Sequence, residues 1–279
     1  MFSHWLFLTL IAGLGTIGFN TFNRQTLKGG CDSTVYAWLF EVFRLLIFLP
    51  LLLFDYHVVW TWISLRTFLL MGISELIAVY LFMKMHAHSE LSLSSILSRL
   101  RIIWTPMVGF IFLDEILSLP QYVGIAVIFG GCLIALGGEI GGSRRGAIYA
   151  LLFSLVNAFS NVFVKQATVF ASPSMVTILF SLPAAIFIPL IMRKARTRIS
   201  HNILPILRPL LVASLFNSLT MFVLVSALRL APTGQVIGIF QGIAMLTVAS
   251  GVIFLHERDH LWRKLAAALV TTIGIILLV

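Results

Sequence analysis

Charge is scarce in this chain of 279 residues. Only 10% of the residues are charged, with 10 acidic residues against 19 lysines and arginines, whereas 59% are hydrophobic. A soluble core could not bury that much apolar surface, so the sequence predicts an all-α, polytopic membrane protein. The net charge of +9 does not indicate nucleic-acid binding, because the basic residues cluster in short loops beside apolar runs, as membrane proteins arrange them.

Cysteine is almost absent as well. Cys31 and Cys132 show no spacing typical of a disulfide framework or a metal site. The stretch HERDH, residues 256–260, matches the H-E-x-x-H zinc protease pattern, but it falls between two apolar runs and no His, Cys, Asp or Glu follows it. We therefore expect no metal, and an intramembrane zinc enzyme is only a remote alternative.

A second motif match, GLGTIG at residues 13–18, fits the dinucleotide fingerprint but lies inside an apolar run with no preceding strand. We expect these glycines to admit a neighbouring helix at close range instead. No cofactor is expected. We therefore expect that the protein is not an enzyme, with the zinc enzyme kept as the remote alternative.

Ten apolar runs are long enough to cross ~30 Å of hydrocarbon as helices. They are Trp5–Leu27, Thr34–Phe54, Arg66–His86, Leu91–Leu113, Pro120–Gly138, Gly146–Thr168, Pro173–Met192, Arg208–Leu228, Thr233–Leu255 and Leu261–Val279. The first is expected to be a span and not a signal peptide, because no basic segment precedes it. Basic loops follow the first, fifth, seventh and ninth runs, so the positive-inside rule places these loops in the cytoplasm and both termini outside.

The two halves of the chain resemble each other. Matching polar residues recur at an offset of 141 or 142 residues: Asn20 with Asn161, Glu75 with Asn217, Arg99 with Gln241 and Glu115 with Glu257. Each half holds five runs, an odd number, so the second half enters the membrane from the opposite side. We predict two inverted five-helix repeats, at residues 1–139 and 144–279, an arrangement typical of secondary transporters.

Two segments carry a resemblance to a known family. PMVGFIFLDEILSLPQYVGIAVIFGGCLIALGG (106–138) and ASGVIFLHERDHLWRKLAAALVTTIGIILLV (249–279) are similar to the small-residue helix, acidic turn and glycine-rich last helix of EamA-like members of the drug/metabolite transporter superfamily. The resemblance covers essentially the whole chain. It implies ten helices around a central cavity and movement of small solutes by alternating access, with export favoured over uptake, across a bacterial inner membrane. It also implies cytoplasmic termini, opposite to the orientation that the basic loops predict, so the sequence leaves the orientation open.

Polar residues inside the predicted spans are the candidate site, because an ionisable group at the bilayer centre costs at least ~2.5 kcal/mol and normally faces a cavity or a partner. The predicted substrate-binding residues are Asn20, Arg44, Glu75, Arg99, Asn157, Asn161, Asn217 and Gln241. Asn20 and Asn161 match across the repeat, so both are expected near the pseudo-two-fold axis. They bind substrate there, or they join helices by hydrogen bonds; the sequence leaves both open.

Three charged residues each allow two interpretations. Arg44 lies three residues after Glu41, on one helical face, which favours a self-neutralising pair over a substrate contact. Glu75 is mid-span without a charged sequence neighbour. It is our candidate for proton coupling or amine binding, and a salt bridge to Arg44 or Arg99 is the alternative.

The fourth predicted span is unusually polar, with Arg99 and Arg101 among several serines. These arginines depart from the family pattern, and guanidinium groups favour a carboxylate or phosphate. We therefore expect a transporter of small amino-acid-like or carboxylate-bearing metabolites, monomeric or weakly dimeric, with protons as a candidate coupling ion. A lipid flippase is the alternative, and it predicts a lateral opening between helices.

Overall fold

Apolar runs of this length form helices because a helix satisfies its backbone hydrogen bonds within the segment, as a bilayer requires. The computed structural model describes residues 4–28, 32–88, 99–136, 144–254 and 261–279. Its helices are α1 His4–Lys28, α2 Ser33–Phe48, η1 Pro50–Leu53, α3 Trp62–His88, α5 Arg101–Leu113, α6 Leu119–Leu136, α7 Arg144–Ala167, α8 Pro173–Ile191, α9 Ala195–Leu228, α10 Thr233–Phe254 and α11 Leu261–Leu278.

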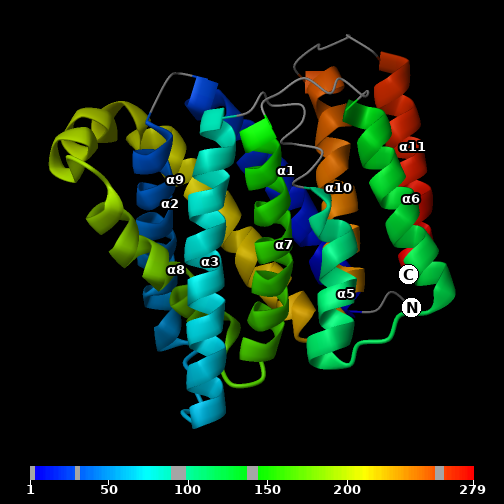
Figure 1. The fold of residues 1–279 in the computed structure, drawn as a ribbon, viewed down its shortest axis with the longest axis horizontal. Helices are drawn as coiled ribbons and strands as arrows, with labels where there is room; N and C mark the ends of the chain where they lie inside the picture. The colour runs from blue at the N-terminus through cyan, green and yellow to red at the C-terminus, as the bar shows by residue number, and fades with distance from the viewer. Residues whose placement is uncertain (1–3, 29–31, 89–98, 137–143, 255–260) are drawn as a thin grey trace.

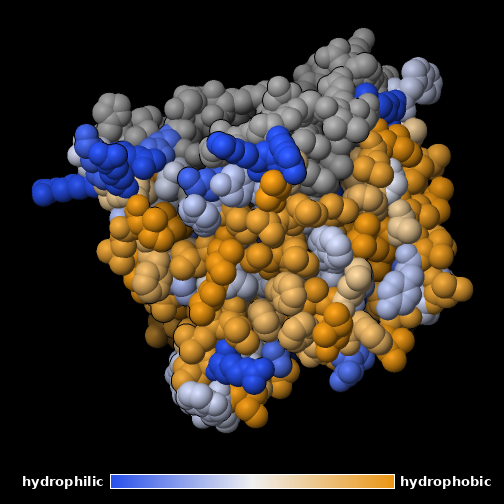
Figure 2. Space-filling view, viewed as in Figure 1, coloured by the Kyte–Doolittle hydropathy of each residue, from blue (hydrophilic) through white to orange (hydrophobic). Residues whose placement is uncertain are grey.

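The outer surface is that of a membrane protein. Within the described residues, five segments are long and apolar enough to cross a bilayer: Thr34–Leu53, Trp62–Phe82, Arg144–Ala167, Pro173–Ile191 and Ile206–Leu228. Figure 2 shows an apolar band across the visible face, with hydrophilic residues gathered toward the two ends of the molecule. Trp62, at the start of α3, and Trp262, at the start of α11, are both strongly exposed, as expected for aromatic residues at a membrane interface.

Among the differences from the predicted bounds, two have a plain physical reason. The second span was predicted to continue to Phe54, but α2 ends at Phe48 and a 3-10 turn begins at Pro50, because proline lacks the N–H that a continuing α-helix needs. The eighth span was predicted to begin at Arg208, but α9 begins at Ala195. Its first turns are polar and basic, so hydropathy alone does not mark them.

The helices stand side by side and alternate in direction (Figure 1). The most extensive contacts join α1 to α9, α3 to α7, α6 to α11 and α2 to α8. The two chain termini lie at one end of the bundle, which we call the terminus end. The start of α7, with Arg144 and Arg145, and the turn that carries Arg193 lie at the opposite end, which we call the basic end.

Small residues allow close packing at several helix crossings. A β-carbon on Gly13 would come within 2.6 Å of Ile243 on α10, which confirms that the GLGTIG glycines serve helix packing. Gly124 and Gly274 bring α6 and α11 into backbone contact, because a β-carbon on either would lie 2.8 Å from the carbonyl oxygen of the other. These contacts fix helix positions around the polar interior.

Candidate functional site

A charged pair is buried between α2 and α8. Arg44 donates from Nη1 to Glu41 Oε2 at 3.0 Å and to Ser181 Oγ at 3.1 Å. Its guanidinium also lies over the rings of Phe40 and Phe180, 5.0 and 5.7 Å from their centroids, where cation–π attraction offsets part of the cost of burial. The pair forms as the spacing of residues 41 and 44 predicts, and it also joins α2 to α8.

Glu75 adds a second carboxylate to this cluster from α3. Its side chain is 7% exposed, Glu41 and Arg44 lie close enough to act on its charge, and Ser160 of α7 is next to it. Among the described residues Arg44 pairs with Glu41, and no ion pair joins Glu75 to an arginine. Two carboxylates thus surround one guanidinium, so the cluster balances its charge when it holds one proton.

A second polar cluster lies between α5, α7 and α10. Arg99, two residues before the start of α5, donates to Gln241 Oε1 of α10 at 3.2 Å. Arg101 donates to Asn157 Oδ1 of α7 at 3.1 Å, and the same oxygen accepts from Asn161 at 3.4 Å. Four of the predicted site residues therefore form two hydrogen-bonded pairs. Arg101, which we did not include among the predicted binding residues, joins the Asn157 pair to α5.

Several polar atoms in this interior have no hydrogen-bond partner within the described part of the chain. They include Arg44 Nε, Arg101 Nε and Asn217 Oδ1. A buried donor or acceptor left unpaired costs about 1–3 kcal/mol, so native proteins normally pair it with a ligand or water. Each of the two guanidinium groups therefore has an Nε–H that can donate a hydrogen bond to a bound solute.

One predicted site residue and one sequence motif fall partly or wholly outside the described residues. Asn20 lies on α1, but its side chain is not among those described, and residues 256–260, with the HERDH motif, lie outside the described ranges. Within the described ranges, no group of three or more His, Cys, Asp or Glu side chains is placed to hold a metal ion. The predicted contact between Asn20 and the axis stays a prediction.

A charged cluster at the terminus end is centred on Glu115, in the turn before α6. Glu115 accepts from Thr233 N at 2.6 Å and from Thr233 Oγ1 at 3.1 Å, at the N-terminus of α10. Lys165 of α7 lies 2.5 Å from Glu115 Oε1 and donates to Ala231 O at 2.6 Å. The four residues, here called the Glu115 cluster, tie α7 and α10 to the turn between α5 and α6.

A third ion pair lies at the basic end, outside the membrane-spanning segments. Arg198 of α9 donates from Nε and Nη2 to the two oxygens of Asp32, at 2.6 and 2.7 Å. Asp32 also accepts from Thr34 N and Val35 N, which caps α2. The Arg198 hydrogen bond and the cap lower the pKa of Asp32, and the same hydrogen bond raises the pKa of Arg198. The bidentate contact fixes α9 to the start of α2.

The fold is that of a multi-pass, all-helical membrane protein, and comparison with known proteins identifies a family domain in its second half. Residues 144–279 match the model of the EamA-like transporter family. These residues therefore carry an EamA-like transporter domain, and the resemblance found in the sequence is confirmed over this half of the chain. A solved structure described as "Crystal structure of protein" aligns over 97% of both chains with a TM-score of 0.71 and 11% sequence identity, which shows a shared fold. No curated protein sequence matches the chain.

Proposed function

We propose that this protein is a secondary transporter that moves a small amino-acid-like or carboxylate-bearing metabolite by alternating access. The proposal gives it ten membrane-spanning helices in two inverted repeats, residues 1–139 and 144–279. The family match over residues 144–279 supports the boundary of the second repeat and the transport class. By the same resemblance, we propose export across a bacterial inner membrane by a monomer or weak homodimer.

The helix contacts support an inverted repeat. Under the repeat, α1 corresponds to α7 and α3 corresponds to α9. The packing of α1 on α9 is then matched by the packing of α7 on α3. The pairs α2 with α8, α5 with α10 and α6 with α11 each join an element to its own counterpart, as elements nearest a two-fold axis must.

The hydrogen bond between Arg99 and Gln241 supports the same axis at the level of single residues. The two positions are 142 residues apart, which is the repeat offset. A residue can contact its own counterpart only if both lie on the axis. Transporters of this architecture bind substrate where the repeats meet, near the bilayer midplane.

The observation that carries the substrate class is the pair of buried guanidinium groups with unpaired Nε donors, on Arg44 and Arg101. A guanidinium presents parallel donors that match a carboxylate, and such charge-assisted bonds are about twice as strong as neutral ones. The Asn157 amide lies beside Arg101 and the Gln241 amide beside Arg99, and an amide oxygen can also accept from an amino group. The chemistry fits a solute with both groups.

Glu75 is the proposed coupling residue. With Glu41 it shares the surroundings of Arg44, so a proton on the carboxylate pair neutralises the cluster. Arrival of a substrate carboxylate at Arg44 would draw the guanidinium away from Glu41 and favour uptake of a further proton. Proton and anionic substrate would then move together through one cluster.

The test is transport into proteoliposomes of the purified protein, with amino acids and small carboxylates offered with and without a pH gradient. We expect gradient-dependent transport of one class, and Glu75→Gln should abolish the gradient dependence because it cannot release a proton. Ser74→Ala is the matched control, since the Ser74 hydroxyl bonds only to Met71 O of its own helix among the described residues. The control should transport normally.

Two outcomes would contradict the proposal. If no solute crosses while fluorescent lipid analogues do, the protein is a flippase and the polar clusters are structural. If transport is gradient-dependent in both the native protein and Glu75→Gln, coupling lies elsewhere.

A further inference from the structure

The hydroxyl groups on α9 are of two kinds. A serine inside a helix can donate to a backbone carbonyl one turn earlier, and Ser226 does so, to Phe222 O at 2.8 Å. Ser214 and Ser218 do not: among the residues that the structure describes, neither Oγ has a hydrogen-bond partner, nor has Oδ1 of Asn217. Both serines are at most 2% exposed, so bulk water does not reach them. We call Ser214, Asn217 and Ser218 the α9 stripe.

The α9 stripe faces the interior of the bundle. Its first member lies three residues before the second and four before the third, so the three share one side of the helix. A second side of α9 lies on α1, where a β-carbon on Gly18 would come within 3.0 Å of the Phe216 ring. A third side carries Leu215 and Leu219, which are exposed on the surface that meets the lipid. The stripe occupies the remaining side.

The stripe lies at the level of Arg44 on α2. The helices α2 and α9 pack against each other, and both run from the basic end, where an ion pair joins their starts (Figure 1). Further along, the rings of Phe48 and Phe222 are 6.3 Å apart. Because the two helices run in the same direction, four residues back from each ring brings Arg44 level with Ser218. Arg44 shares the helical face of Phe48, and its Nε is also unpaired within the described ranges.

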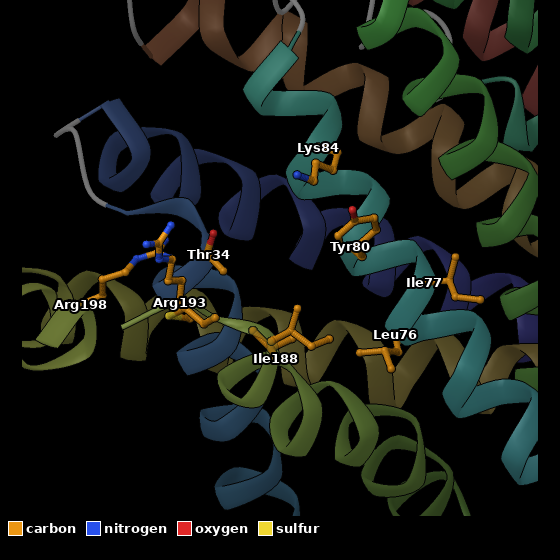
Figure 3. Close-up of a pocket in the computed structure, with 10 residues that line it drawn as sticks. Thr34, Leu76, Ile77, Tyr80, Lys84, Ile188, Arg193 and Arg198 are labelled. Atoms are coloured by element: carbon orange, nitrogen blue, oxygen red, sulfur yellow. The ribbon is translucent and has the colours of Figure 1, made fainter. Parts of the chain in front are cut away.

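An apolar layer closes this space toward the basic end. Val35, Leu39 and Leu210 pack there in one cluster with Ile188. A groove of about 420 Å³ adjoins the layer between α3 and α8, and Leu76 and Ile188 belong to its lining (Figure 3). The described lining of the groove includes no member of the α9 stripe. The unpaired polar atoms of the stripe therefore belong to the interior and not to the groove.

We propose that Arg44 and the α9 stripe together bind a short carboxylate that carries hydroxyl groups. The carboxylate would accept from Arg44 Nε, and the hydroxyl groups would pair with the stripe. This inference rests on the proposed function and narrows its substrate class. The stripe would select a hydroxyl group over a methyl group at the same position of the solute.

The hydrogen-bonding capacity of the stripe favours hydroxyl groups over an ammonium group. A serine hydroxyl both donates and accepts, and a hydroxyl of the solute does the same, so each can satisfy the other. An ammonium group only donates. It would pair with Asn217 Oδ1 but would leave the protons of Ser214 and Ser218 without an acceptor. A methyl group would leave all three side chains unpaired, which is unfavourable for buried polar groups.

The experiment measures dissociation constants by isothermal titration calorimetry of the purified protein in nanodiscs. The probes are three pairs of solutes that differ only in hydroxyl groups: glycerate and propionate, free serine and free alanine, gluconate and hexanoate. We expect the hydroxylated member of the best-bound pair to bind about tenfold more tightly, as a net hydrogen bond of the usual strength gives. Ser214→Ala and Ser218→Ala should each lower this ratio about threefold, because each removes one partner of the solute.

The matched control is Ser226→Ala, which removes a hydroxyl of the same helix that is already bonded to Phe222 O. It should leave the ratio of affinities unchanged. Without solute, Ser214→Ala and Ser218→Ala should keep or raise the unfolding temperature, because each removes a buried hydroxyl that has no partner in the described part of the chain. This second measurement shows that the two variants fold.

Three outcomes would overturn the inference. Equal affinities within every pair would mean that the stripe holds only water. A preference that survives in the Ser214→Ala, Ser218→Ala double variant would place the selecting groups elsewhere, and both results leave the transport of carboxylates intact. If none of the six solutes binds, the inference is wrong. Transport of another carboxylate into proteoliposomes would then keep the proposed function, whereas no transport of any carboxylate would refute both.

Discussion

Asp32 performs two tasks with one carboxylate, and the two can be separated. It caps α2 through Thr34 N and Val35 N, and it holds Arg198 of α9. Asparagine retains an oxygen that caps a helix about as well as aspartate does, but it cannot form the ion pair. Alanine loses both. The residue therefore allows the cap and the ion pair to be measured one after the other.

We expect Asp32→Asn to lower stability by no more than about 1 kcal/mol, because the pair is partly exposed. Asp32→Ala should cost about 1 kcal/mol more for the lost cap. The lowered pKa of Asp32 means that its ion pair stabilises the folded state at neutral pH, and that this contribution is lost as pH falls below the ordinary value of 3.8. Thermal unfolding in detergent should therefore show a difference between native protein and Asp32→Asn that shrinks only below that pH.

Single residues also show what sequence reasoning can reach. Glu41 and Arg44 are three positions apart on one helix, so their contact follows from helical geometry and was predicted. The contacts of Glu115 and Arg101 cross 118 and 56 positions. They depend on the rotation of each helix about its axis, which apolar periodicity fixes poorly when a helix is apolar on most sides.

Among the elements, α6 and α11 are held closest by their glycines. A β-carbon on Gly274 would lie 2.8 Å from Gly124 O and 2.8 Å from Ile128 N, both backbone atoms that cannot move without shifting a helix. Gly130, on the same α6, has no atom within 4 Å of such a β-carbon. The two positions form a matched pair in which only one glycine is required by packing.

We predict that Gly274→Ala destabilises the protein by about 1–3 kcal/mol, as overpacking usually does. Gly130→Ala should be neutral or stabilising by up to about 1 kcal/mol, because alanine favours a helix over glycine. The effect of each substitution is measured by the unfolding temperature in detergent and by the yield of monodisperse protein. Equal effects of the two substitutions would show that α6 and α11 do not touch as described.

Element prediction from hydropathy succeeded where the membrane sets the length of a helix and failed where a helix leaves it. The ends of α9 show both cases: its C-terminal end at Leu228 agrees with prediction, while its polar start at Ala195 does not. Residues 195–205 are too polar to partition into hydrocarbon, so they form no apolar run from which a helix could be predicted. The end of α2, in contrast, could have been predicted, because Pro50 marks it in the sequence.

At the scale of the whole molecule, the Glu115 cluster joins helices of both halves at the terminus end. Under alternating access, one end of the bundle must separate while the other closes. Lys165 and Thr233 belong to the second half and Glu115 to the first, so the cluster must break when the terminus end opens. Under the proposed mechanism, its strength would set part of the balance between the two conformations.

We predict that Glu115→Gln favours the conformation open at the terminus end and lowers stability by about 2 kcal/mol, since it removes hydrogen bonds to a charged group. Spin labels at Ile116→Cys and Val169→Cys, both highly exposed in loops at that end, would report the change as longer distances in pulsed electron resonance, with Cys31 and Cys132 replaced. Asp114→Asn is the control: this neighbouring carboxylate is exposed, and asparagine tolerates its left-handed backbone (φ 54). Unchanged distances with Glu115→Gln would refute a gating role.

The contact between Arg99 and Gln241 bears on how such a molecule could have arisen. In a dimer of two identical subunits, a residue on the two-fold axis faces its own copy, so arginine there would meet arginine at hydrogen-bonding distance, and like charges in a low dielectric repel strongly. A fused chain escapes this restriction because its halves can diverge. The axis can then hold one guanidinium, with a neutral amide opposite it to accept its hydrogen bond. Two identical subunits can place either no charge or two charges at such a position on the axis. A single charge there requires two different halves, encoded in a single chain or in two different genes.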